Sequence, residues 1–122
     1  IIKSILEECD KKLIKGIVHC SGGAQTKILH FISENLHVIK NNMFDPPMLF
    51  KLIQKESKTT WHEMYKVFNC GHRMELYVEP QIADEIINIS GRFNVEGRII
   101  GKVEKSNSKK LTIKSQFGDF QY

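Results

Sequence analysis

The sequence predicts an α/β protein in which helices cover the faces of a mixed sheet. Apolar runs typical of strands alternate with amphipathic helical patterns through the first half of the chain. Near the end, two alternating patterns flank a polar turn at 105–110, which is typical of a hairpin. With 122 residues, the chain has the size of one ordinary domain, so we expect a single domain over 1–122.

The stretch at 16–32 organises the prediction, because it reads as a strand, a glycine turn and a helix. Residues 17–20 form a short, mostly apolar run. Ser21, Gly22 and Gly23 interrupt it, and helical spacing follows over 24–33. Glycine lets the backbone approach a ligand closely, and the first amides of a helix have no partner inside the helix. The turn is therefore a candidate phosphate site.

Four further segments have the apolar spacing of helices. Residues 2–13 are amphipathic, and Pro80 opens a helical pattern that continues to residue 93. Asp45 followed by two prolines is typical of a helix start, and the apolar residues after it predict a buried side for that helix: Met48, Leu49, Leu52 and Ile53. Thr60 and Glu63 have the spacing of a capping box and predict another start directly after it.

Strand patterns occupy most of the remaining chain. Residues 36–39 are a short apolar run, and alternation over 73–79 predicts a half-buried strand with Glu75 facing solvent. A strand interrupted by two glycines is predicted over 95–103, and we expect it to form a hairpin with the pattern at 111–114. The tail at 116–122 has three aromatic residues and no clear period.

Composition narrows the classes of function. The net charge of +4 comes from lysines scattered singly, so nothing supports a nucleic-acid partner. Three widely spaced cysteines do not suit a secreted disulfide framework and suit a reducing cytoplasm. No run is long enough to span a membrane, and no signal peptide is visible. The chain begins with Ile1 instead of Met, and we expect it to be part of a longer protein.

The candidate site residues each have an ordinary structural alternative. Two glycines between a strand and a helix also serve as a plain tight connection, and the turn lacks the lysine of a P-loop. Thr26 and Lys27 could add a hydroxyl and a positive charge to a bound anion, although Lys27 equally suits a solvated helix face. His19 stands beside the turn, where a ligand would sit, or is satisfied by a neighbouring backbone group.

Two His-Cys pairs contain enough ligands for a tetrahedral zinc ion, but not at the usual spacing. They are His19 with Cys20 and Cys70 with His72. A buried free cysteine that behaves as a small apolar side chain is the simpler interpretation, so we expect no metal site.

Three motifs resemble the C-terminal domain of the phosphoribosylformylglycinamidine cyclo-ligase family, also called aminoimidazole ribonucleotide synthetases. In chain order they are G-I-V-H-C-S-G-G-A, D-P-P-M-L-F-K-L-I-Q and H-E-M-Y-K-V-F-N-C-G-H-R-M. The resemblance covers nearly the whole chain, and the run from Glu63 to Gly71 is its most specific part. It implies a mixed sheet with helices on its faces, partly like a ferredoxin fold. The same superfamily includes formylglycinamidine ribonucleotide synthetase, selenophosphate synthetase and a hydrogenase maturation factor.

The resemblance also implies an activity. Enzymes of this family use ATP with Mg²⁺, held mainly by an N-terminal domain, to close the imidazole ring of formylglycinamidine ribonucleotide in purine synthesis. We therefore expect this chain to be the substrate-binding part of a larger two-domain cytoplasmic ligase, which acts as a homodimer. By itself, the chain should bind no cofactor and should be inactive. Neither nucleic acid nor membrane is expected as a partner.

Residue roles follow from the same resemblance. Ser21, Gly22 and Gly23 match the glycine turn that would hold the substrate phosphate, with Thr26 beside it, and His19 would face the reacting groups as the catalytic candidate. Asn69, Cys70 and Gly71 match a motif that would form a wall of the active site. Ala24 stands where the family often has a third glycine. The alternatives are a non-enzymatic anion- or metal-binding scaffold, a domain of another superfamily member and, as a weaker one, a nucleic-acid module.

Overall fold

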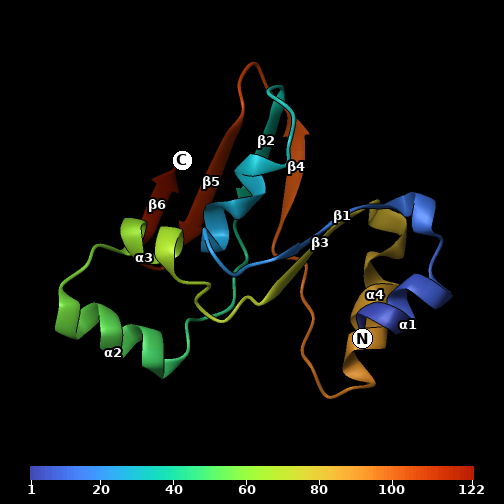
Figure 1. Cartoon of the computed structure of the whole chain (residues 1–122), viewed down its shortest axis with the longest axis horizontal. Coiled ribbons are helices and arrows are strands. Elements are labelled where there is room, and N and C mark those ends of the chain that lie inside the picture. Colours follow the sequence, from blue (N-terminus) through green and yellow to red (C-terminus); the bar gives the residue numbers. More distant parts are fainter. The chain divides into compact units, whose positions relative to one another are not determined.

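The computed structural model describes all residues 1–122, and it divides them into two compact units (Figure 1). Unit 1 comprises Ile1–Ile17 and Glu75–Ile99, whereas unit 2 comprises Val18–Met74 and Ile100–Tyr122. The chain passes from one unit to the other at three places: within the strand β1 (Ile14–His19), within its paired strand β3 (Met74–Val78), and between Ile99 and Ile100. No helix is long and apolar enough to cross a membrane.

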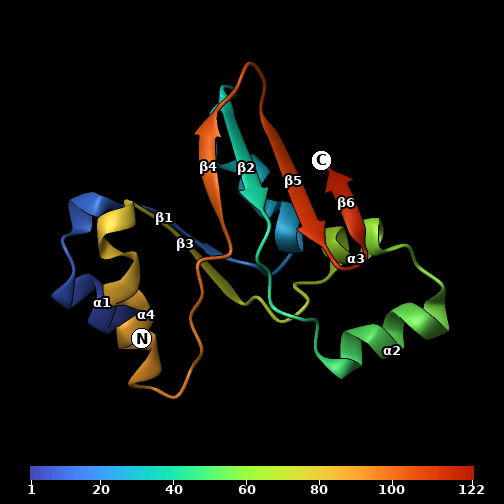
Figure 2. The same cartoon turned by 180° about the vertical axis from the view of Figure 1, so that it is seen from behind.

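Unit 1 is built on two helices that lie side by side, α1 (Ile2–Glu8) and α4 (Ala83–Gly91) (Figures 1 and 2). Short 3₁₀ turns precede the paired strand and the second helix: η1 (Lys11–Leu13) and η3 (Pro80–Ile82). The core consists of buried apolar side chains at helical spacing: Ile5, Cys9, Ile82 and Ile89. The apolar periodicity of both helices therefore predicted this core correctly.

The predicted helix over 2–13 ends earlier than its apolar pattern. Cys9 adopts an extended conformation at the end of α1. The side chain of Asp10 then accepts a hydrogen bond from the amide of Lys12, at 3.0 Å, and starts the separate turn η1. A local side-chain bond to the backbone thus competes with the helix and ends it.

Unit 2 contains a four-stranded sheet with the order β4-β2-β5-β6 (Figure 2). Its strands are β2 (Leu36–Lys40), β4 (Gly101–Lys105), β5 (Lys110–Ser115) and β6 (Gly118–Gln121). The β2–β5 pair is parallel, and the β2–β4 and β5–β6 pairs are antiparallel. The mixed sheet that the sequence predicted is confirmed.

The prediction of a hairpin between the strand patterns at 95–103 and 111–114 is wrong. β2 lies between β4 and β5, with Val38 opposite both Val103 and Leu111. The first of the two strands is also shorter than predicted, because it begins at Gly101. The hairpin is instead formed by β5 and β6, and β6 lies in the aromatic tail for which the sequence gave no period.

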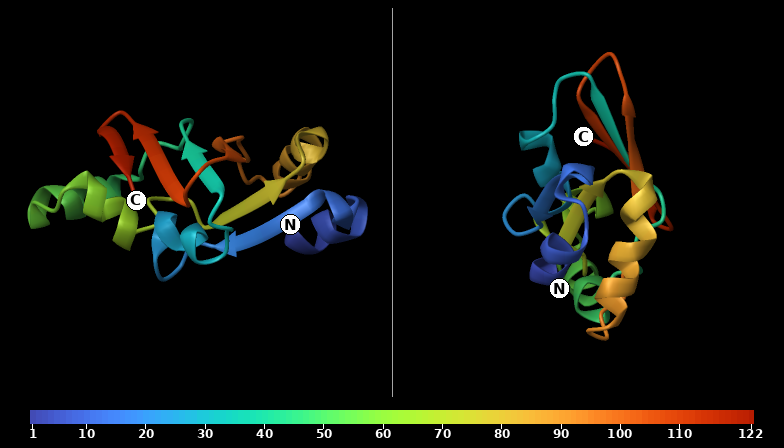
Figure 3. Two further views of the ribbon diagram at one scale, coloured as in Figure 1. Left: turned by 90° about the horizontal axis from the view of Figure 1, so that it is seen from above. Right: turned by 90° about the vertical axis from the view of Figure 1, so that its right-hand side faces the viewer.

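The 3₁₀ helix η2 (Ala24–His30) and the helix α3 (Trp61–Val67) pack together in unit 2, and η2 also contacts β5 (Figure 3). Their buried side chains form a core with those of the sheet: Ala24, Ile28, Met64, Tyr65, Val38, Leu111 and Ile113. The side chain of Thr60 accepts a hydrogen bond from the amide of Glu63, as the capping box predicted. The helix predicted over 24–33 exists, but it is a 3₁₀ helix that ends at His30.

The helix α2 (Met48–Ser57) contradicts the predicted burial of its apolar side. Met48, Leu49 and Leu52 are 76%, 61% and 52% exposed, and no residue of the helix is fully buried. Asp45 does not cap the helix, because its carboxylate binds the ammonium of Lys51 and the amide of Gln116 instead. Glu75 was also placed wrongly, because it is buried and accepts a hydrogen bond from the hydroxyl of Tyr77 at 2.8 Å.

Candidate functional site

The glycine turn joins β1 to η2 through a run of left-handed residues. Gly22 and Gly23 have φ angles of 62° and 85°, and Ala24 keeps this conformation with a φ of 44°. The left-handed region favours glycine, so an alanine there costs about 1–2 kcal/mol of local strain. Ala24 therefore adopts the backbone shape that a third glycine would adopt.

Three backbone amides of this turn have no hydrogen-bond partner within the chain. Those of Gly22, Gly23 and Ala24 donate no hydrogen bond within the chain, whereas the amide of Ser21 donates to the carbonyl oxygen of His19 at 2.9 Å. Ser21 and Gly22 are exposed, Gly23 is half-buried, and Ala24 is buried at 2% exposure. Successive backbone N–H groups in such a turn form a concave donor surface that favours anions. We call these three amides open because no carbonyl group or carboxylate of the chain accepts a hydrogen bond from them.

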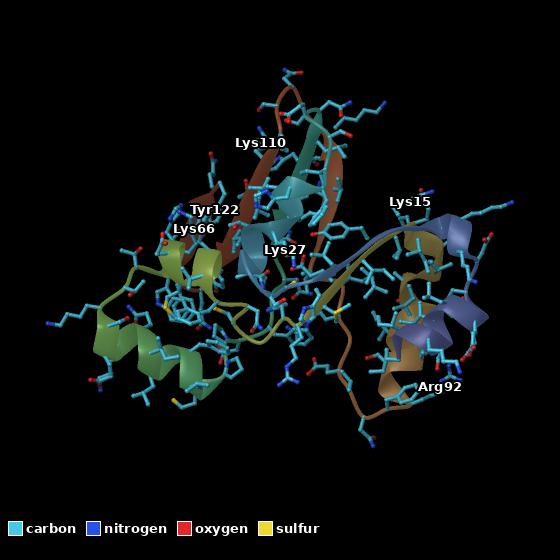
Figure 4. All side chains as sticks on the ribbon, in the orientation of Figure 1. Lys15, Lys27, Lys66, Arg92, Lys110 and Tyr122 are labelled. Carbon is cyan, nitrogen blue, oxygen red and sulfur yellow. The ribbon has the colours of Figure 1, made fainter.

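Three side chains surround the turn. His19 is exposed, and its Nδ1 lies 2.7 Å from the hydroxyl oxygen of Ser21. The ammonium of Lys27 donates to the carbonyl oxygens of His19 and Ser21, at 3.0 and 2.8 Å, and it places a positive charge beside the turn (Figure 4). The hydroxyl of Thr26 donates to the carbonyl oxygen of Gly23 at 2.9 Å, which closes the turn.

The second predicted motif is a tight turn after α3. Cys70 and Gly71 both have positive φ angles, 50° and 98°, and the side-chain oxygen of Asn69 accepts a hydrogen bond from the amide of Gly71 at 2.9 Å. A Cβ atom at Gly71 would lie 2.9 Å from Cδ of Pro47, so the position needs glycine for space as well as for conformation.

Cys70 belongs to this turn, but its thiol is not a reactive group. Its side chain is fully buried, and burial raises the pKa of the thiol to about 12. Because only the thiolate is a strong nucleophile or metal ligand, Cys70 stays neutral and unreactive near pH 7. Asn69, which is half-buried, and Gly71, which is exposed, present this motif at the surface.

One buried side chain brings the two motifs together. Gln25 is completely buried, and its amide nitrogen donates to the carbonyl oxygen of Asn69 at 2.8 Å. Its backbone and side-chain oxygens both accept from the ammonium of Lys40, each at 2.9 Å. Lys40 and the role of Gln25 could not be predicted, because nothing in the local sequence pattern of β2 indicates a buried lysine.

Comparison with known proteins identifies the family of the chain. Residues 1–114 match the family described as AIR synthase related protein, C-terminal domain. Three relatives are each named phosphoribosylformylglycinamidine cyclo-ligase. The one from Methanococcus maripaludis is 30% identical over 97% of this chain and 35% of its own length. The one from Syntrophus aciditrophicus is 32% identical over 92% of this chain and 33% of its own length. The one from Saccharolobus solfataricus is 40% identical over 70% of this chain and 24% of its own length.

The match thus covers most of this chain, and the chain spans about a third or less of the length of these relatives. The motifs at the glycine turn and at Asn69–Gly71 both lie inside the matched residues. The chain belongs to the AIR synthase related family, as its C-terminal domain.

Proposed function

We propose that this chain is the C-terminal, substrate-binding domain of a phosphoribosylformylglycinamidine cyclo-ligase of purine biosynthesis. Its glycine turn would hold the phosphate group of formylglycinamidine ribonucleotide. The observation that carries this proposal is the set of open amides at Gly22, Gly23 and Ala24. A phosphate placed there would accept hydrogen bonds from the backbone, and the charge of Lys27 would favour it electrostatically.

The other site residues have roles that fit this placement. The hydroxyl of Ser21 would donate a hydrogen bond to the phosphate. The hydroxyl of Thr26 would keep the turn closed through its bond to Gly23. His19, which is exposed and touches the hydroxyl of Ser21, would reach toward the reacting part of the substrate as the catalytic candidate. Asn69, Cys70 and Gly71 would form a wall of the active site, in which the side chain of Cys70 is buried and Asn69 holds the amide of Gly71.

ATP with Mg²⁺ would be held by the rest of the parent polypeptide, as the family resemblance implies. In this chain, no group of three or more His, Cys, Asp or Glu side chains could hold a metal ion, and we assign it no step that involves Mg²⁺. The N-terminal domain of the same polypeptide is therefore the proposed partner. We further propose a cytoplasmic homodimer for the complete enzyme and no activity for this chain by itself.

The proposal is tested by calorimetric titration with ribose 5-phosphate and with ribose. We expect the phosphorylated sugar to bind and ribose to give no signal, since the phosphate supplies the contacts. Gly22→Ala should weaken binding, because its Cβ would enter open space beside the amides and its φ of 62° would be strained. Gly91→Ala is the matched control, because its Cβ also meets nothing within 4 Å and it lies in α4 of unit 1.

Two results would contradict the proposed phosphate site. One is equal binding of ribose and ribose 5-phosphate. The other is a Gly22→Ala variant that binds ribose 5-phosphate as tightly as the Gly91→Ala variant does. Zinc bound in a stoichiometric amount to the purified protein would instead favour the scaffold alternative, because the proposed ligase domain has no place for it.

A further inference from the structure

A lysine is buried at the end of the central strand of unit 2. Lys40 is the last residue of β2, and it is only 1% exposed. A lysine is almost never fully buried unless its ammonium is held by polar groups, because removing the charge from water is costly. Here the ammonium donates to both oxygens of Gln25, the backbone carbonyl and the side-chain amide oxygen, each at 2.9 Å.

The hydrogen bonds from Lys40 to Gln25 act on the glycine turn, because Gln25 lies next to it in sequence. Gln25 follows Ala24, the last of the three residues whose amides are open. Its backbone carbonyl, held by Lys40, shares a peptide plane with the amide of Thr26, which donates to the carbonyl oxygen of Gly23 at 2.9 Å. The carbonyl of Gly23 lies in the same peptide plane as the amide of Ala24, so these contacts give that amide a defined orientation. Amides that already point toward a ligand bind it more tightly, because the ligand does not have to order them.

Gln25 also connects Lys40 to the second motif, at Asn69–Gly71. Its side-chain oxygen is held by Lys40, which fixes the direction of its amide nitrogen toward the carbonyl oxygen of Asn69 at 2.8 Å. The carbonyl of Asn69 also accepts a hydrogen bond from the amide of His72 at 3.0 Å, within the same turn. A continuous chain of hydrogen bonds therefore leads from the ammonium of Lys40 to the turn at 69–71.

We propose that Lys40 is a positioning residue for the phosphate site. By holding Gln25 at two oxygens, it orients, through Thr26 and Gly23, the peptide plane that carries the amide of Ala24, and it couples the glycine turn to the Asn69–Gly71 turn. This inference rests on the proposed phosphate site and adds to it a residue that would touch no substrate atom. A bound phosphate should therefore be sensed at Gly71 as well as at Gly22.

Amide spectra of the ¹⁵N-labelled chain, titrated with inorganic phosphate and with ribose 5-phosphate, test the inference. In the unaltered chain, we expect the resonances of Gly22 and Gly71 to shift together. Lys40→Met removes the donors and keeps most of the length of the side chain. It should weaken ribose 5-phosphate binding about tenfold, which corresponds to the free energy of one hydrogen bond to a charged group. Lys40→Arg keeps a cation and its donors, and it should restore part of that affinity.

Two further variants separate positioning from a loss of stability. Gln25→Glu keeps an acceptor for Lys40 but has no donor for the carbonyl of Asn69, so Gly22 should still respond to ribose 5-phosphate while the response of Gly71 disappears. Phe117→Leu is the stability control, because it removes a ring whose centroid lies 3.7 Å from that of Trp61 and removes none of the Lys40–Gln25–Asn69 hydrogen bonds. It should bind ribose 5-phosphate like the unaltered chain.

The outcomes separate a failure of the proposed phosphate site from a failure of the positioning role of Lys40. If neither probe shifts Gly22 in the unaltered chain, the proposed phosphate site is wrong, and this inference falls with it. If Gly22 shifts but Lys40→Met binds as tightly as Phe117→Leu, the inference alone is overturned. If Lys40→Met does not fold, Gln25→Glu decides, since a response of Gly71 that persists in Gln25→Glu overturns the coupling.

Discussion

At the scale of single residues, backbone conformation accounts for more of the candidate site than side-chain chemistry does. Five residues of the two motifs have positive φ angles: Gly22, Gly23, Ala24, Cys70 and Gly71. For Ala24 and Cys70 these angles are strained, and strained backbone conformations persist where the surrounding structure holds them and cluster at binding sites. The sequence indicated the glycine positions, because glycine adopts these angles freely. It could not indicate that Ala24 and Cys70 adopt them too.

Gly71→Ala should destabilise unit 2 by about 2–3 kcal/mol, because it combines a strained φ of 98° with a contact of 2.9 Å to the rigid ring of Pro47. Gly22→Ala has a strained φ but no contact, so it should cost only about 1 kcal/mol. Urea denaturation of both variants measures the difference. Equal losses of stability would show that the contact with Pro47 does not matter.

The thiol of Cys70 should make folding stability depend on alkaline pH. Its folded pKa is raised to about 12 from an ordinary value of 9.0, so the unfolded chain loses this proton first as the pH rises. The contribution is fully present below pH 9 and is lost as the pH rises toward 12. Urea denaturation from pH 7 to pH 11 should show a smaller alkaline loss of stability for Cys70→Ala than for the unaltered chain. The same slope in both proteins would contradict the assignment to Cys70.

At the scale of elements, the sequence predicted which segments are helices and strands better than how they pair or which way they face. Periodicity is a local property, and it located α3, α4, β2 and β3 close to their observed positions. The position of β2 between β4 and β5 depends on contacts between distant segments, which no local pattern records. The polar turn at 105–110 therefore resembled a hairpin although its flanking strands do not pair.

The edge strand β4 should depend on Gly101. A Cβ atom there would lie 1.9 Å from the carbonyl oxygen of Ile39, so no side chain fits while Gly101 stays paired with Lys40. Gly101→Ala should detach β4 from β2, and hydrogen exchange should show lost protection in β4 while the β5–β6 pair stays protected. Lys105→Ala, at the exposed far end of the same strand, is the control and should leave protection unchanged. Full protection of β4 in Gly101→Ala would be inconsistent with this close approach.

The helix α2 shows why an apolar pattern alone did not predict the buried side. Apolar residues occupy more than one face of it, and the structure turns Phe50 inward, with its ring 6.0 Å from that of Phe68. Leu49→Lys and Leu52→Lys should therefore change stability by no more than about 0.5 kcal/mol, since both positions are exposed. Phe50→Ala should cost about 2–3 kcal/mol. Thermal unfolding compares them, and a large loss in either lysine variant would mean that the outer face is covered.

At the scale of the whole molecule, the family and the broad fold were readable from the sequence, and the connection between the two motifs was not. The motifs lie more than forty residues apart in sequence, and Gln25 with Lys40 links them through buried hydrogen bonds. Such pairings depend on the folded path of the chain. The division into two compact units also had no signal in composition, because no linker-like segment separates them.

The chain by itself should not convert formylglycinamidine ribonucleotide to aminoimidazole ribonucleotide when ATP and Mg²⁺ are supplied. It spans about a third or less of the length of its cyclo-ligase relatives, and in the proposed function ATP is held by the remainder. An assay of the purified chain for the ring-closed product measures this. Product formed at a rate proportional to the amount of chain would contradict the proposed division of labour.

The central claim is that the open amides of the glycine turn bind the phosphate of a sugar phosphate. A crystal structure of the chain grown with ribose 5-phosphate tests it most directly. The account predicts a phosphate whose oxygens lie within hydrogen-bond distance of the amides of Gly22, Gly23 and Ala24, close to the ammonium of Lys27. A phosphate bound elsewhere on the chain, with these amides facing only solvent, would contradict it.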